Sequence, residues 1–184
     1  AQELLEQIKT EKEKLVKDGK LKKSALTDSV IFKGDDNKYY EQVGKSDKEI
    51  TEEIAFDLPN GWSWCRLKDI CSIFTGATFK KEETVTTKEG VRILRGGNIS
   101  PFELRIKDDD IFLTKDKVKE DIILKENDIL TPAVTSLENI GKMVRVNSDM
   151  PNTTVGGFVF IIRLYLKNQW LSKYILYLLS SPFM

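Results

Sequence analysis

The sequence predicts an α+β protein in which a β-rich domain lies between a helix at each end of the chain. Apolar residues repeat near helical spacing in residues 2–18 and again in residues 168–184. Between them, short apolar segments alternate with Gly, Pro, Asn and Asp, a pattern typical of many short strands joined by turns. With 184 residues, 40% of them hydrophobic and 32% charged, the chain is long enough to form a core beneath a polar surface.

The first predicted element is a helix over residues 2–18. Its apolar stripe is interrupted at Glu11 and Lys12, which indicates an outer helix or one that docks on another chain. Residues 20–53 are polar and contain one candidate strand, at 29–33. We therefore predict that residues 1–53 form an N-terminal helix and a polar connector with little core of its own.

The β-rich domain is predicted over residues 54–167. It opens with the segment DLPNGWSWCRL, where strong turn residues precede Trp62 and Trp64 at strand spacing. We expect both tryptophans to pack in the core. Short helices are predicted at 68–74 and 115–121, and strands are predicted at 64–67, 91–95, 111–114, 128–134, 140–146 and 155–165.

The last predicted region, residues 168–184, is a helix with a broad apolar stripe that Pro182 stops. We interpret it as the truncated start of a longer helical region, and we expect its stripe to contact another protein. The residues of the stripe are Trp170, Leu171, Tyr174, Ile175, Leu178 and Leu179.

Composition excludes several classes of site. The chain has no histidine, so it holds no Ser-His-Asp triad, Cys-His pair, histidine-ligated metal or histidine general base. Cys65 and Cys71 are too few for a disulfide framework, and their spacing matches no zinc pattern. With no signal peptide and no apolar run near the roughly 20 residues that span a bilayer, a cytoplasmic protein is expected. Lys+Arg and Asp+Glu both number 29, so net charge alone predicts no polyanionic partner.

Two loops carry residue types suited to nucleic acid. In FTGATFKKEE (74–83), Thr78, Lys80 and Lys81 follow a glycine, and hydroxyls and amines in loops suit phosphate oxygens and base edges. The predicted strand at 91–95 ends in the sequence RGGN.

The sequence RGGN has its own possible chemistry. Arg95 can bind guanine through two hydrogen bonds and Asn98 can bind adenine in the same way. Gly96 and Gly97 let the backbone approach a ligand. From residue types alone, an ordinary turn with solvated polar side chains is the more common explanation for both loops.

Other polar residues give weaker indications of a functional site. Residues 131–146 place Ser136 and Lys142 around another turn, but an ordinary hairpin explains that pattern equally well. The carboxylates of residues 108–110 could suggest a metal, although three consecutive aspartates are more often a solvated turn. The chain has no GxxxxGK[ST] or GxGxxG phosphate loop and no Asn/Asp-Pro-Pro-aromatic motif of amino-methyltransferases.

The assembled motifs resemble the specificity (S) subunits of type I restriction–modification enzymes. The segment LPNGWSWCRLKDICSIFTGAT is similar to the Leu-Pro-x-Gly-Trp-x-Trp-x-x-Leu opening of a target recognition domain, which is followed by a Gly-containing loop. Looser similarities lie at the strand and loop of 92–98, at IGK (140–142) and at GGFVFI (156–161), while YILYLLSS resembles the start of the conserved helical region that follows. A complete S subunit has two recognition domains, whereas this chain has one.

The resemblance implies a fold, a function and partners. The β-rich, partly β-helix-like domain would recognise one half of a split target in double-stranded DNA, with Arg95 to Asn98 as a recognition loop. No catalysis and no cofactor are expected on this chain. Methyltransferase (M) subunits would bind S-adenosylmethionine, the restriction (R) subunit would use ATP and Mg²⁺ and be contacted indirectly, and a second S half or recognition domain would complete the target.

The DNA contacts expected from this resemblance combine the loops above: Thr78, Lys80, Lys81, Arg95, Gly96, Gly97, Asn98, Ser136 and Lys142. Two alternatives remain. One is an enzyme that works through carboxylates at residues 108–110 or at Glu82 and Glu83, which requires a raised pKa on one carboxyl group. The other is a protein-interaction domain that does not bind DNA.

Overall fold

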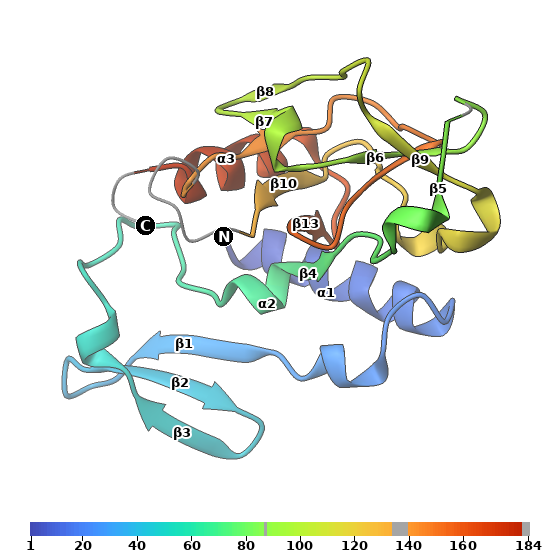
Figure 1. Cartoon of the computed structure of the whole chain (residues 1–184). Coiled ribbons are helices and arrows are strands. Elements are labelled where there is room, and N and C mark those ends of the chain that lie inside the picture. Colours follow the sequence, from blue (N-terminus) through green and yellow to red (C-terminus); the bar gives the residue numbers. More distant parts are fainter. Residues whose placement is uncertain (87, 134–139, 182–184) are drawn as a thin grey trace. The chain divides into compact units, whose positions relative to one another are not determined.

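A computed structural model describes residues 1–86, 88–133 and 140–181 (Figure 1). The chain forms two compact units, residues 1–71 and 72–184. The domain boundaries after residues 53 and 167 stay predictions. Helices and sheets are mixed along the chain, which confirms the α+β class. None of the described helices is long and apolar enough to cross a membrane.

The first unit contains the predicted N-terminal helix and a sheet that was only partly predicted. Helix α1 spans Gln2–Lys17, close to the predicted bounds. Strands β1 (Ser29–Lys33), β2 (Tyr39–Val43) and β3 (Ser46–Glu49) form an antiparallel sheet in that order. The expectation of a connector between residues 20 and 53 was wrong for β2 and β3. Their side chains are largely exposed, so apolar alternation does not mark them.

Polar contacts stabilise this first unit. Arg66 donates to Glu41 at 2.6 Å and pairs with Glu53 at 2.8 Å, which ties the sheet to the short helical turn η2 (Thr51–Glu53). The Ser29 hydroxyl donates to Asp69 in helix α2 (Leu67–Ile70) at 2.6 Å. These contacts order a region that has few buried apolar side chains.

The tryptophans of the LPNGWSW segment do not lie in a strand, so the strand predicted at 64–67 is wrong. Trp64 is half-buried, with its ring centroid 5.3 Å from that of Phe56. Trp62 is 56% exposed, which contradicts the expected core position. The period-two spacing arises in an irregular segment before α2, where no sheet partner fixes it.

The described part of the second unit contains three sheets. One has the order β11-β10-β13-β4, and its strands are Val144–Arg145, Ile129–Pro132, Val159–Leu164 and Cys71–Thr75, the last beginning at the unit boundary. Another has the order β12-β6-β9-β5, with strands Thr153–Val155, Val91–Leu94, Ile111–Leu113 and Thr84–Val85. The small hairpin β7-β8 comprises Ile99–Ser100 and Glu103–Leu104.

The core of the second unit comes mostly from the inward positions of these strands, with Ala77, Leu124 and Val146 added from the segments between them. A first cluster comprises Leu94, Ile99, Leu124, Leu130, Val144, Val146, Val155, Val159 and Ile161. A second comprises Ala77, Val91, Ile93 and Leu113. Helix α3 (Gln169–Leu179) starts at Asn168, whose side-chain oxygen accepts hydrogen bonds from the backbone N–H groups of Trp170 and Leu171.

Several predicted elements differ in type or length. The helix predicted at 68–74 ends at Ile70, and β4 follows at once, because residues 71–75 alternate between buried and exposed positions. The helix predicted at 115–121 is two short helical turns, Lys115–Lys117 and Glu120–Ile122. The strand predicted at 155–165 is split into β12 and β13 by a turn at Gly157 and Phe158.

Candidate nucleic-acid interface

Four loops of the second unit lie side by side where β4, β6, β10 and β12 end. The Ala77 N–H donates to Val155 O at 2.8 Å, and the Gly156 N–H donates to Leu94 O at 2.8 Å. The Ala133 N–H, just after β10, donates to Phe158 O at 2.8 Å. These bonds join residues 76–78, 95–98, 132–133 and 156–158 into one surface, which we call the loop cluster.

Glycines have different roles in the cluster. A β-carbon on Gly76 would lie 1.8 Å from Val155 O, so this glycine permits close packing within the protein itself. A β-carbon on Gly96 would meet Pro132 at an ordinary 3.6 Å, and one on Gly97 would lie 3.4 Å from Lys107 Nζ. The protein therefore requires glycine at position 76 more strictly than at position 96.

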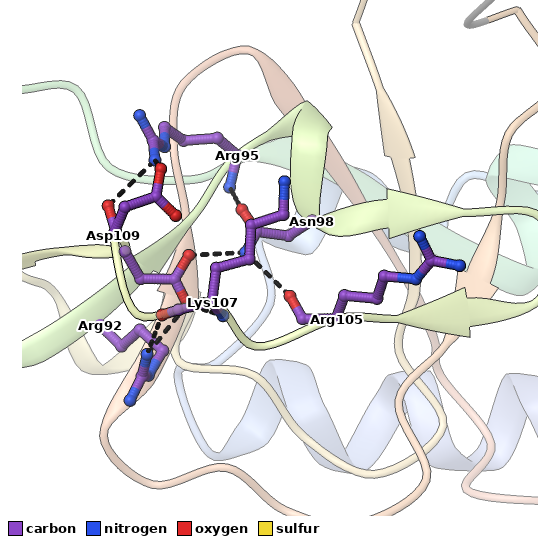
Figure 2. A network of polar contacts seen from close by, with 7 residues as sticks. Arg92, Arg95, Asn98, Arg105, Lys107 and Asp109 are labelled. Atoms are coloured by element: carbon purple, nitrogen blue, oxygen red, sulfur yellow. Dashed lines mark hydrogen bonds and ion pairs between the residues drawn. The ribbon is translucent and has the colours of Figure 1, made fainter.

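The turn that contains Arg95 is held by the side chain of Asn98 (Figure 2). The Asn98 amide oxygen accepts from the Arg95 N–H at 2.8 Å, and its nitrogen donates to Arg105 O at 2.8 Å and to Asp110 Oδ1 at 2.6 Å. Only 1% of Asn98 is exposed. A hydrogen bond from Asn98 to adenine would require these bonds to break, so the geometry favours a role in shaping the loop over base contact.

Asp110 is the buried centre of the same network. Its carboxylate accepts from Arg92 Nη1 and from the Lys107 N–H, each at 2.9 Å. Burial alone raises the pKa of Asp110, but the hydrogen bonds from Lys107, Asn98 and Arg92 outweigh burial and hold this pKa below its ordinary value. The network therefore keeps a charged carboxylate beneath the loop.

Arg95 points out of this network. Its side chain is 48% exposed, and Nη2 contacts the backbone oxygen of Asp109 at 3.2 Å and its carboxylate at 3.4 Å. Because both side chains are exposed, the pair adds little stability and can exchange for another acceptor. The guanidinium is thus presented on a rigid backbone while its own position stays adjustable.

The loop after β4 presents its lysines to solvent. Thr78, Lys80 and Lys81 are all exposed. The Glu83 carboxylate accepts from the Lys80 N–H at 2.7 Å, and this bond, together with Lys117, lowers the pKa of Glu83. Phe79 anchors the loop by packing on the second core cluster.

The two remaining candidate residues lie on the segment after β10. Ser136 lies outside the described residues. Lys142 is half-buried and precedes β11, which is at the opposite edge of its sheet from β4. The contacts of the loop cluster therefore involve the segments of Thr78 and Arg95 to Asn98, and their use as DNA contacts stays a prediction.

The carboxylates proposed for the alternative enzyme have other uses here. Asp110 and Glu83 both have lowered pKa values, the opposite of what a general acid needs. Among the described residues, no group of three Cys, Asp or Glu side chains is arranged to hold a metal ion. The expectation that residues 108–110 form a solvated turn was wrong for Asp110.

Sequence reasoning missed two participants in this surface. Asp110 was hidden in a run of three aspartates, where nothing distinguishes the inward side chain from the outward ones. Phe158 lies in the turn between β12 and β13 and is 83% exposed. The sequence GGFVF could have indicated that Phe158 is exposed. Side chains alternate between faces in extended backbone, so a buried Val159 places Phe158 and Phe160 outward.

Comparisons with known proteins identify a related protein. No family model matches it. The specificity subunit of the type I restriction enzyme EcoAI from Escherichia coli is 35% identical over 155 residues, which cover 82% of this chain. The chain is related to type I restriction specificity subunits. It spans 23% of the length of that E. coli subunit.

A solved structure has a similar fold. The crystal structure of the HsdS subunit from Thermoanaerobacter tengcongensis aligns with a TM-score of 0.50 and 20% identity, over 68% of this chain and 30% of that subunit. In both comparisons, this chain matches only part of a longer protein. The resemblance inferred from the LPxGWxW opening is confirmed at the level of the family.

Proposed function

We propose that this chain is a sequence-specific DNA-binding module that recognises one half of a bipartite target. The observation that carries the proposal is its 35% identity to a type I specificity subunit over 82% of its length. The loop cluster supports it, because rigid turns there present Arg95, Thr78 and nearby lysines to solvent. The lowered pKa values of Asp110 and Glu83 favour this function over the carboxylate enzyme.

Within the module, different side chains would have different tasks. Arg95 would bind a base edge in the major groove, where a guanidinium matches the O6 and N7 acceptors of guanine. Lys80 and Lys81 would contact phosphates, as Lys142 would from the segment before β11, and Thr78 would donate to a phosphate or a base. Asn98 would hold the backbone of Arg95 in place and so position the Arg95 side chain for the base.

Catalysis would belong to partner subunits. We propose that M subunits carry S-adenosylmethionine and dock near α3, whose exposed side chains include Trp170, Tyr174 and Tyr177. The R subunit, with ATP and Mg²⁺, would be reached through that complex. A second S half or recognition domain would supply the other half of the target.

The test is selection from a pool of random duplex DNA at low salt with the full 184-residue chain, followed by sequencing of the retained DNA. We expect a short enriched motif. The Arg95→Ala chain should lose about 1–3 kcal/mol on that motif and accept other bases at one position. Arg105→Ala is the matched control, because Arg105 is an exposed arginine directly after the adjacent hairpin. Its side chain pairs with Glu103 and extends away from Arg95 in Figure 2.

Two results would contradict the proposal. Retention of DNA without an enriched motif would indicate phosphate attraction alone. An unchanged motif with Arg95→Ala would remove Arg95 from the recognition residues.

A further inference from the structure

Phe158 is the most exposed of the large hydrophobic side chains in the described part of the chain, at 83%. A single exposed apolar residue is ordinary in a soluble protein, so exposure alone is no evidence of a role. Its position is the informative feature. Phe158 occupies a central position of a tight turn, where Gly, Asn, Asp and Ser are the residues that turn geometry favours.

The turn presents Phe158 on a fixed backbone. The Val159 N–H donates to Gly156 O at 3.0 Å and closes the turn, while the Ala133 N–H donates to Phe158 O at 2.8 Å. Gly156 is also bridged to Ala77 in parallel fashion. An aromatic ring on such a backbone loses little conformational freedom when it meets a partner.

The neighbours of Phe158 indicate the chemistry of that partner. The Gly156 N–H donates to the oxygen of Leu94, the residue before Arg95. A β-carbon on Gly96 would meet Pro132, which is next to Ala133, the residue that donates to Phe158. A β-carbon on Gly157 would lie 3.0 Å from the Thr78 hydroxyl oxygen. The exposed ring of Phe158 is thus carried by a turn that adjoins the segments of Arg95 and Thr78. The major groove offers the same mixture, because thymine alone carries a methyl group beside the polar base edges.

We propose that Phe158 recognises the C5-methyl group of a thymine in the half-site, adjacent to the base that Arg95 contacts. This inference rests on the proposed function and adds a specificity-determining residue to it. A methyl group has no hydrogen bond to offer, so recognition depends on the apolar area that the ring covers. At roughly 0.8 kcal/mol for one buried carbon, the contact corresponds to about a fourfold change in affinity.

The experiment uses the DNA motif that selection enriches with the full chain. Each thymine of the motif is replaced in turn by uracil, which lacks only the methyl group, and affinity is measured for the parent chain and for Phe158→Ala. At one thymine, we expect replacement by uracil to weaken binding of the parent chain about three- to tenfold. The Phe158→Ala chain should bind the thymine and uracil duplexes equally well. Phe158→Leu should retain part of the sensitivity. Phe56→Ala, which removes an exposed aromatic from the first unit, should retain all of it.

The outcomes separate this inference from the proposed function. Selection that enriches no motif overturns the DNA-recognition proposal and this inference with it. An enriched motif without a T·A pair overturns the inference alone. So does equal sensitivity to uracil in the parent and Phe158→Ala chains.

Discussion

The loops after β4 and β6 carry similar residues but are ordered in different ways. Residues 76–83 are held by backbone packing at Gly76 and by Glu83 at the far end, so the lysines between them stay outward. Residues 95–98 are held from inside by the polar side chains of Asn98 and Asp110, and Arg95 is directed outward. The first loop is also anchored by Phe79, which packs on the second core cluster, but its lysines make no buried hydrogen bond in the structure. A loop fixed by buried side-chain hydrogen bonds constrains the residue it presents more closely than a loop held by packing alone. We therefore expect base specificity from the second loop and general attraction to DNA from the first.

The largest expected effect tests how the first loop is fixed. Gly76→Ala would place a β-carbon 1.8 Å from the backbone oxygen of Val155, which cannot rotate away. We expect a loss of about 3 kcal/mol or more in the free energy of unfolding, measured by urea denaturation. The matched change Gly96→Ala meets Pro132 at 3.6 Å and should cost less than about 1 kcal/mol. Equal losses for the two changes would refute the difference in packing.

The next effect tests the buried carboxylate beneath the second loop. Asp110→Asn replaces the carboxylate that accepts hydrogen bonds from Arg92 and from the Lys107 N–H with a neutral amide. The loss should be about 3 kcal/mol in the free energy of unfolding. Asp109→Asn is the control, since Asp109 is exposed, and should stay within about 0.5 kcal/mol.

The lowered pKa of Asp110 also sets a pH dependence. Because its folded pKa lies below its unfolded value, Asp110 stabilises the fold above about pH 4, and this contribution is lost as pH falls through the folded pKa. Denaturation between about pH 5 and pH 2 should therefore show a steeper decline for the parent chain than for Asp110→Asn. Parallel pH profiles would contradict the assignment.

Removal of the Asn98 side chain should have a smaller effect. Asn98→Ala leaves the Arg95 N–H and the Arg105 carbonyl without their amide partner, which should cost about 1–3 kcal/mol in the free energy of unfolding. If Asn98 positions Arg95, the variant should also lose discrimination at the base that Arg95→Ala affects. Asn152→Ala removes an exposed side chain and keeps the backbone oxygen that accepts from the Arg92 N–H, so it should change neither quantity. Altered discrimination at a different base would instead assign Asn98 a direct contact.

The sequence predicted structure correctly where the spacing of apolar residues determines the element. It did not do so where polar contacts between distant residues determine the structure. Strands β6 and β9 bury most of their apolar residues, and α1 and α3 carry apolar residues at helical spacing, so the type of these four elements was predicted from the sequence. Strands β2 and β3 bury little, and no periodic signal marks them. The prediction of Asn98 as a base contact used its residue type, whereas its burial depends on Asp110, twelve residues away in the sequence.

The smallest expected effect concerns the lysines of the first loop. Lys81→Ala should leave the free energy of unfolding unchanged, because the side chain is exposed. It should weaken binding to the selected motif and to unrelated duplexes by the same factor, and lower the slope of log affinity against log salt by about one. Lys45→Ala, an exposed lysine in the β2–β3 turn, supplies the comparison for loss of one charge. A loss confined to the selected motif would place Lys81 among the specificity residues, and the division of tasks between the two loops would then fail.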